Sequence, residues 1–206
     1  MNKLSFRVII NIVIAVVTFA AWLWMVFRGG GTLSSRGLRS LKYYTVLSNL
    51  FCAVIACIWL ALHGNPQYQR FLAVLKYTGA ITIFLTFLTV VFFLGPIFGY
   101  RWMFAGANFW FHLVIPLLCA AEFIFTNQYT PTGTEKLAAV IPMFLYGCGY
   151  LGNILINGVG EGSHTNDWYG FTRWGLPAGV LIFVLLCAVV YMTGVLFAHL
   201  SAYLHR

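Results

Sequence analysis

The run NFWFHLVIPLLCAAEF, Asn108–Phe123, is apolar enough to lie inside a bilayer, yet it contains a histidine and a glutamate. Ionisable side chains are costly in hydrocarbon, so they are functional candidates when they occur there. A helix that begins near Ala105 and rises about 1.5 Å per residue places His112 about 10 Å below the membrane surface. An imidazole at that depth either stays neutral with partners at both nitrogens or changes charge during a reaction. His112 is therefore the first candidate for chemistry.

A threonine at the start of another apolar run could supply the second reacting group. Thr45 lies in the segment YYTVLSNL, Tyr43–Leu50. A threonine hydroxyl is a weak nucleophile alone, but an adjacent imidazole can take its proton during attack on a carbonyl and later protonate the leaving group. Thr45 and His112 would together form the minimal machinery of acyl transfer.

Other polar residues could assist this pair. Three asparagines are candidate donors to the oxyanion of an acyl-transfer reaction, namely Asn49, Asn108 and Asn153. Asp167 either orients His112 as the third member of a triad or caps a turn in its own loop, and the cap is favoured because aspartate is a common turn residue.

The composition places these residues in a membrane protein. Of 206 residues, 61% are hydrophobic and 8% are charged, whereas soluble domains carry about 25% charged residues. The formal net charge is +8, but the basic residues stand singly between apolar runs, as interfacial anchors and topology determinants do. The pattern therefore predicts membrane lipids, and not nucleic acid, as partners.

Apolar runs of about 20 residues predict an all-α fold, a bundle of transmembrane helices in which residues 1–206 form one domain. The six expected spans are 8–27, 43–63, 72–95, 105–126, 136–157 and 177–200. The first follows Lys3 and Arg7 like a signal peptide, but it reaches about Phe27, beyond the roughly 15 residues of a cleaved segment, so we expect it to be retained. Basic residues divide evenly between the two sides, so the positive-inside rule gives no orientation.

This topology brings the candidates to one side of the membrane. Alternating crossings place the start of the second span, the start of the fourth, the end of the fifth and the last loop together. Thr45, His112, Asn153, Asn157 and the segment NDWYGF are therefore expected to converge on one mouth.

The polar stripes also have a structural interpretation. Thr45, Ser48, Asn49 and Cys52 share one face of the second span, and Thr78, Thr82, Thr86 and Thr89 share one face of the third. Such side chains often hydrogen-bond a neighbouring helix, and this explanation is favoured for Ser48 and the threonines of the third span. Glu122 lies near the far end of its span, so we expect an interfacial carboxylate that snorkels or is capped.

Three segments resemble a known family. YYTVLSNL with Thr45, and FHLVIPLL, Phe111–Leu118, with His112, resemble the signature segments of the androgen-induced-gene and androgen-dependent-regulator family of multi-pass membrane threonine hydrolases. DWYGF, Asp167–Phe171, is similar to the aromatic loop before that family's last helix. The resemblance spans about residues 8–200. It departs from the expected pattern at Gly170, where the family leads us to expect a proline.

The resemblance implies hydrolysis of esters between fatty acids and hydroxy fatty acids, with Thr45 as the nucleophile and His112 as the base. On this hypothesis the chain is an intramembrane lipid esterase of a compact bacterial-type branch, in a bacterial inner membrane, with a lipid ester as its substrate.

Two other classes of function remain open. A small transporter, channel or lipid-binding protein would line a path with His112 and the polar stripes, although the sequence shows only one ionisable residue deep in a span. A haem or quinone protein would need histidines that face each other at depth, whereas the other histidines, His63, His164, His199 and His205, lie at helix ends or in loops.

No cofactor or metal is expected. The cysteines Cys52, Cys57, Cys119, Cys148 and Cys187 all lie within apolar segments and lack the paired spacing of a metal or disulfide framework. The sequence does not indicate an oligomeric state.

Overall fold

The computed structural model describes residues 3–28, 37–127, 129–161 and 165–205. In this part of the chain, six helices are long and apolar enough to cross a membrane. They cover Leu4–Phe27, Tyr44–Leu62, Pro66–Phe98, Ala107–Thr126, Gly133–Asn157 and Leu176–Leu204. The predicted all-α, six-span architecture is therefore confirmed, and the largest difference in a boundary is at the third span, which begins at Pro66 instead of near residue 72.

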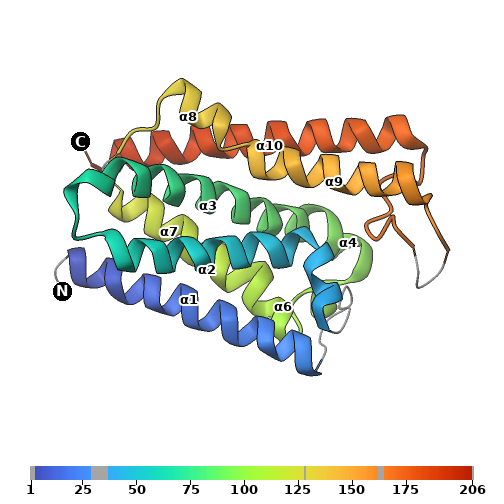
Figure 1. Ribbon diagram of the computed structural model, residues 1–206, viewed down its shortest axis with the longest axis horizontal. Helices are drawn as coiled ribbons and strands as arrows, with labels where there is room; N and C mark the ends of the chain where they lie inside the picture. The colour runs from blue at the N-terminus through green and yellow to red at the C-terminus, as the bar shows by residue number, and fades with distance from the viewer. Residues whose placement is uncertain (1–2, 29–36, 128, 162–164, 206) are drawn as a thin grey trace.

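The six spans contain several shorter helical elements. The elements run in the order α1 (Lys3–Arg28), η1 (Gly37–Lys42), α2 (Tyr44–Leu62), η2 (Pro66–Tyr68), α3 (Gln69–Thr89), η3 (Val90–Leu94), α4 (Gly95–Phe98), α5 (Tyr100–Met103), α6 (Ala107–Phe109), η4 (Trp110–Val114), α7 (Ile115–Thr126), α8 (Gly133–Ala138), α9 (Ile141–Asn157) and α10 (Leu176–Leu204). The start of α1, the end of α10 and α8 lie at one end of the bundle (Figure 1). The start of α2, α6 and the end of α9 lie at the other end (Figure 1).

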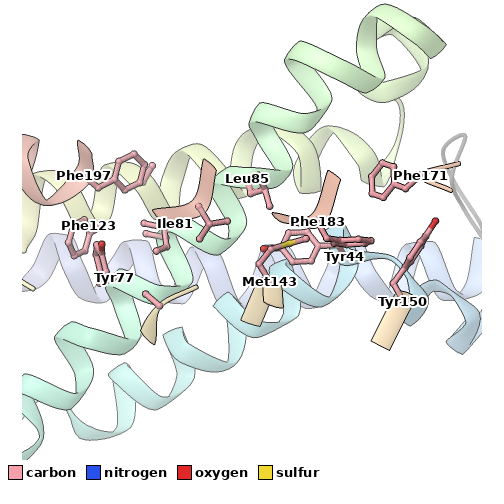
Figure 2. Packing of buried hydrophobic residues seen from close by; sticks show 14 of the residues in the cluster. Tyr44, Tyr77, Ile81, Leu85, Phe123, Met143, Tyr150, Phe171, Phe183 and Phe197 are labelled. Carbon is pink, nitrogen blue, oxygen red and sulfur yellow. The ribbon is translucent and has the colours of Figure 1, made fainter. Parts of the chain in front are cut away.

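Helices α3 and α7 form the centre of the bundle. They pack against each other and both contact α10, while α3 also packs on α2, α7 on α1, and α9 mainly on α10. Figure 2 shows the largest buried cluster, in which Tyr77 and Ile81 of α3 lie near Phe123 of α7 and Phe197 of α10. A Cβ atom at Gly194 of α10 would overlap the Tyr77 hydroxyl. Glycine at this position therefore permits the close approach of α10 to α3.

Two wide π-helical turns interrupt the long helices, and each precedes a proline. The turn η3 is followed by Pro96, and η4, which contains His112, is followed by Pro116. Proline has no N–H, and its ring collides with the carbonyl four residues earlier in a regular α-helix. A π-helical turn accommodates this conflict by widening the helix locally.

Contacts between polar side chains join α2 to α3. The Ser48 hydroxyl lies 3.1 Å from the Thr86 hydroxyl, and the Tyr44 hydroxyl donates to the Thr82 carbonyl at 3.0 Å. The structural interpretation of Ser48 and Thr86 is therefore confirmed for this pair.

A buried ionic cluster corrects one expectation from the sequence. Glu122 is 1% exposed, and its carboxylate lies 3.2 Å from the Lys76 ammonium and 3.5 Å from Arg7 Nε. Asn11 bridges the pair, donating to Glu122 at 3.3 Å and accepting from Lys76. The prediction of a snorkelling or capped Glu122 at the interface was wrong, because α1 and α3 cover this face of α7 and supply its partners. His112 is therefore not the only buried ionisable residue in the spans.

Candidate active site

His112 lies in the π-helical turn η4 and is 1% exposed. Its Nδ1 is 2.6 Å from the carbonyl of Met103, the last residue of α5. A carbonyl oxygen can only accept, so Nδ1 carries the hydrogen, and in a neutral ring Nε2 keeps its lone pair. The contact with the Met103 carbonyl therefore fixes the tautomer in which Nε2 is free to accept a proton.

Thr45 lies in the first turn of α2 and is 8% exposed. It lines a cavity of about 30 Å³ together with side chains from α3, α9, α10 and the loop before α10. A volume of this size can hold a water molecule. Thr45 is thus positioned beside a small, partly open cavity at the mouth of the bundle.

Asn49 joins the Thr45 turn to the His112 turn. Its amide nitrogen donates to the Thr45 carbonyl at 2.7 Å and to the Phe111 carbonyl at 3.1 Å. In a π-helical turn the Phe111 carbonyl would accept from residue 116, which is a proline without an N–H. Asn49 therefore satisfies a carbonyl that Pro116 leaves without a partner, and it does so next to His112.

The two predicted catalytic side chains are not directly paired. In the described residues, no hydrogen bond joins the Thr45 hydroxyl to His112, and His112 is not among the residues that line the Thr45 cavity. What the structure brings together is their backbone segments, through Asn49. The catalytic roles of Thr45 and His112 remain predictions.

The three predicted oxyanion donors are in different situations. Both hydrogens of the Asn49 amide are used by backbone carbonyls. Asn153, on α9, accepts from Asn157 at 2.8 Å and forms no described hydrogen bond with α2. The Asn108 amide nitrogen, at the start of the His112 helix, is buried without a hydrogen-bond partner. Asn108 is therefore the member of this set whose unused donor is buried.

Asp167 organises the loop that precedes α10. One of its oxygens accepts from the Tyr150 hydroxyl and from the Phe171 amide at 2.8 Å. The other accepts from the Thr172 amide at 2.9 Å and the Thr172 hydroxyl at 2.7 Å. Burial by itself would raise the pKa of Asp167, but these hydrogen bonds outweigh it and lower the pKa below its ordinary value. The contacts are those of a turn cap, and none of them is with His112.

The departure at Gly170 has a backbone cause. Gly170 has φ +70, in the left-handed region that glycine adopts readily, and its amide donates to the Asp167 carbonyl at 3.0 Å. Proline is locked near φ −65° and has no N–H to donate. The turn found in this chain therefore excludes the proline that the family pattern suggests.

Tyr169, in the same loop, is a site residue that the sequence argument did not single out. Its hydroxyl accepts from the Tyr44 amide at 2.9 Å, and its side chain lines the Thr45 cavity. Burial raises the pKa of Tyr169 to about 12, so the phenol stays protonated at neutral pH. The predicted meeting of Thr45 with the NDWYGF segment is confirmed here. The sequence feature that could have identified Tyr169 is its place in the NDWYGF loop, as an aromatic residue with a hydroxyl, at the end of the bundle where Thr45 was expected.

A second, larger space adjoins the Thr45 cavity. It is an apolar groove of about 540 Å³ between α3 with η3 and α10. Four residues line both spaces, namely Leu85, Thr89, Phe171 and Leu186. Phe92 and Trp174 on its walls are 75% and 70% exposed. The groove is thus adjacent to the Thr45 cavity and lies at the outer, apolar surface of the bundle.

Neither the arrangement of potential metal ligands nor comparison with known proteins assigns a function to this site. Within the described ranges, no group of three or more His, Cys, Asp or Glu side chains could hold a metal ion, and His164 lies outside these ranges. Comparisons with protein-family models, curated proteins and solved structures find no match, so membership of the threonine hydrolase family stays a prediction based on the three segments.

Proposed function

We propose that this multi-pass membrane protein hydrolyses lipid esters inside the bilayer, with Thr45 as the nucleophile and His112 as the general base. The observation that carries the proposal is the position of Thr45, beside a small cavity that shares its wall with an apolar groove open to the lipid side. An acyl chain can lie in this groove while its ester group reaches Thr45. The resemblance of the three segments to membrane threonine hydrolases agrees with this arrangement.

The tautomer of His112 determines which of its nitrogens accepts the proton in the proposed reaction. Thr45 Oγ1 attacks the ester carbonyl carbon, and its proton passes to His112 Nε2, the nitrogen left free by the Met103 contact. The carbon–oxygen bond to the alcohol breaks, and the imidazolium protonates the departing alkoxide. Water activated by the same nitrogen then hydrolyses the acyl-threonine and releases the fatty acid.

Two groups support the charged intermediate. Asn108 has an unused amide donor, and the Tyr169 hydroxyl lies on the wall of the Thr45 cavity. Each donor to an oxyanion is typically worth about 3 kcal/mol of barrier lowering. Substrate binding must also bring Thr45 and His112 within hydrogen-bond distance, and catalytic hydrogen bonds commonly tighten only when substrate is bound.

The nucleophile is tested by a fluorophosphonate probe on the purified protein. We expect the probe to attach to the peptide that contains Thr45, with attachment lost in Thr45→Ala and kept in Thr45→Ser. Ser48→Ala is the matched control, because this hydroxyl lies one turn away and contacts Thr86. Labelling that persists in Thr45→Ala would remove Thr45 from the mechanism.

The base and the groove are tested by turnover of long-chain and short-chain fluorogenic esters. A positioned base supplies roughly 10² to 10⁴ in rate, so His112→Ala should lose at least about a hundredfold on both esters. Leu88→Trp should fill the groove, and it should slow the long-chain ester much more than the short-chain one. Equal effects of Leu88→Trp on the two esters would contradict an acyl-binding role of the groove.

The buried ionic cluster favours a second candidate function, a path for protons or another small solute. It places Lys76 and Glu122 inside the bundle, about 15 Å along the helix axis from His112 at about 1.5 Å per residue. This alternative predicts flux in proteoliposomes that depends on His112 and Glu122 but not on Thr45. Flux that is absent from the wild-type protein would eliminate it.

A further inference from the structure

A polar recess lies at the end of the bundle opposite to the Thr45 mouth. It has a volume of about 320 Å³ and is lined by residues that include Arg7, Trp59, Gln69, Arg70, Asn127 and Tyr129. These residues come from the start of α1, the end of α2, the start of α3 and the segment after α7. The recess shares no lining residue with the Thr45 cavity or the apolar groove.

Arg7 is the unusual member of this recess. Its side chain is 22% exposed, and its guanidinium carbon lies 4.7 Å from the centre of the Trp59 ring. The Nε atom is buried without a hydrogen-bond partner, and no described residue accepts a hydrogen bond from the Arg7 guanidinium. A guanidinium has donors arranged in a planar fork that suits an oxyanion. Arg7 is therefore held in place by stacking on Trp59 and by its 3.5 Å ionic contact with Glu122, while its guanidinium donates no described hydrogen bond.

The nearby carboxylates already have closer cationic partners. Glu135 accepts from Arg70 at 2.9 and 3.1 Å and from the Tyr129 hydroxyl at 2.7 and 2.8 Å. Glu122 lies 3.2 Å from Lys76, closer than its 3.5 Å contact with Arg7. Arg7, Arg70 and Lys76 thus face two carboxylates, which leaves one positive charge in excess. A single anion would balance it.

The depth of the recess indicates where such an anion comes from. Arg7 lies in the second turn of α1, Arg70 follows the first residue of α3, and Thr126 is the last residue of α7. Helix ends lie at the level of the lipid headgroups in a membrane-spanning bundle. We propose that this recess binds the phosphate of a membrane phospholipid, with Arg7 as its main donor and Arg70 as a second one. The site is distinct from the proposed catalytic residues.

The test measures binding to the purified full-length protein in a neutral detergent, by native mass spectrometry and by tryptophan fluorescence. The probes are dioctanoyl phosphatidylglycerol, dioctanoylglycerol, which has the same chains without phosphate, and inorganic phosphate. We expect saturable binding of the phospholipid, and binding of dioctanoylglycerol at least about tenfold weaker, since hydrogen bonds between charged groups are among the strong ones. This comparison uses only the wild-type protein, so it does not depend on the folding of a variant.

Variants then assign the site. Arg7→Gln should weaken phospholipid binding at least about tenfold, and Arg7→Lys should weaken it less because the charge is kept. Arg101→Gln is the matched control, because Arg101 is an exposed arginine of α5 that does not line the recess, and Thr45→Ala should also leave binding unchanged. Equal affinity for phospholipid and dioctanoylglycerol, or unchanged affinity in Arg7→Gln, would overturn the proposal. Inorganic phosphate that binds as tightly as the phospholipid would overturn the headgroup as the source of the anion.

Discussion

The ion pair between Lys76 and Glu122 offers the most quantitative prediction about this fold. Both side chains are buried, and the ammonium and carboxylate are 3.2 Å apart. At an effective dielectric constant of about 20, this distance corresponds to an attraction of about 5 kcal/mol. Breaking a buried pair by removing one partner typically costs about 3 to 5 kcal/mol, because the remaining charge is left uncompensated. Arg7, at 3.5 Å from the other carboxylate oxygen, still offsets part of that loss.

We therefore expect Lys76→Met to lower the free energy of unfolding by about 3 kcal/mol, at the low end of that range. The double variant Lys76→Met with Glu122→Met removes both charges, so it should lie within about 1 to 2 kcal/mol of the wild type. The measurement is reversible unfolding in mixed detergent micelles, followed by tryptophan fluorescence, with Arg101→Gln as an exposed control.

Two results would refute this account of the pair. A Lys76→Met protein within about 1 kcal/mol of the wild type would mean that water or Arg7 already neutralises Glu122. A double variant no more stable than the single one would mean that Lys76 acts through packing of its aliphatic chain and not through its charge.

Four further predictions concern the mouth of the bundle. Asn49→Leu removes the two hydrogen bonds from the Asn49 amide to the Thr45 and Phe111 carbonyls. It should therefore lower the free energy of unfolding by about 2 kcal/mol in an unfolding assay and abolish ester turnover in a hydrolysis assay. Pro116→Ala restores an N–H to the helix, so η4 should relax toward an α-helix, with unchanged or higher thermal stability but slower hydrolysis. Gly170→Ala should cost about 1 to 2 kcal/mol through its φ of +70 alone, since a Cβ there meets nothing within 4 Å, and thermal unfolding would reveal it. The hydrogen bonds that Asp167 accepts outweigh its burial and lower its pKa. The stabilisation that Asp167 provides is therefore present above its unfolded pKa of about 4 and is lost as pH falls through the lower folded pKa. Hydrogen exchange of residues 167–172 should rise only in acid for the wild type, and at neutral pH as well for Asp167→Asn.

The sequence by itself determined the six spans and which of their polar residues lie at the same end of the bundle. Hydropathy is a local property, and every span must satisfy its own backbone hydrogen bonds in lipid, so the runs could be located without knowledge of their neighbours. The π-helical turn at His112 was not predicted from the sequence, although Pro116 is a local signal for an irregular turn, because a proline removes an N–H wherever it lies in a helix.

Tertiary structure alone decided which polar groups meet. Glu122 and Asn11 are separated by 111 positions in the chain, and Asn49 and Phe111 by 62. No periodicity within one helix indicates that Glu122 faces Lys76, that Asn49 satisfies the Phe111 carbonyl, or that Tyr169 reaches the start of α2. These contacts depend on how each helix is rotated against its neighbours, which is set by the packing of side chains such as Tyr77 against Gly194 and by the need to give each buried polar group a partner.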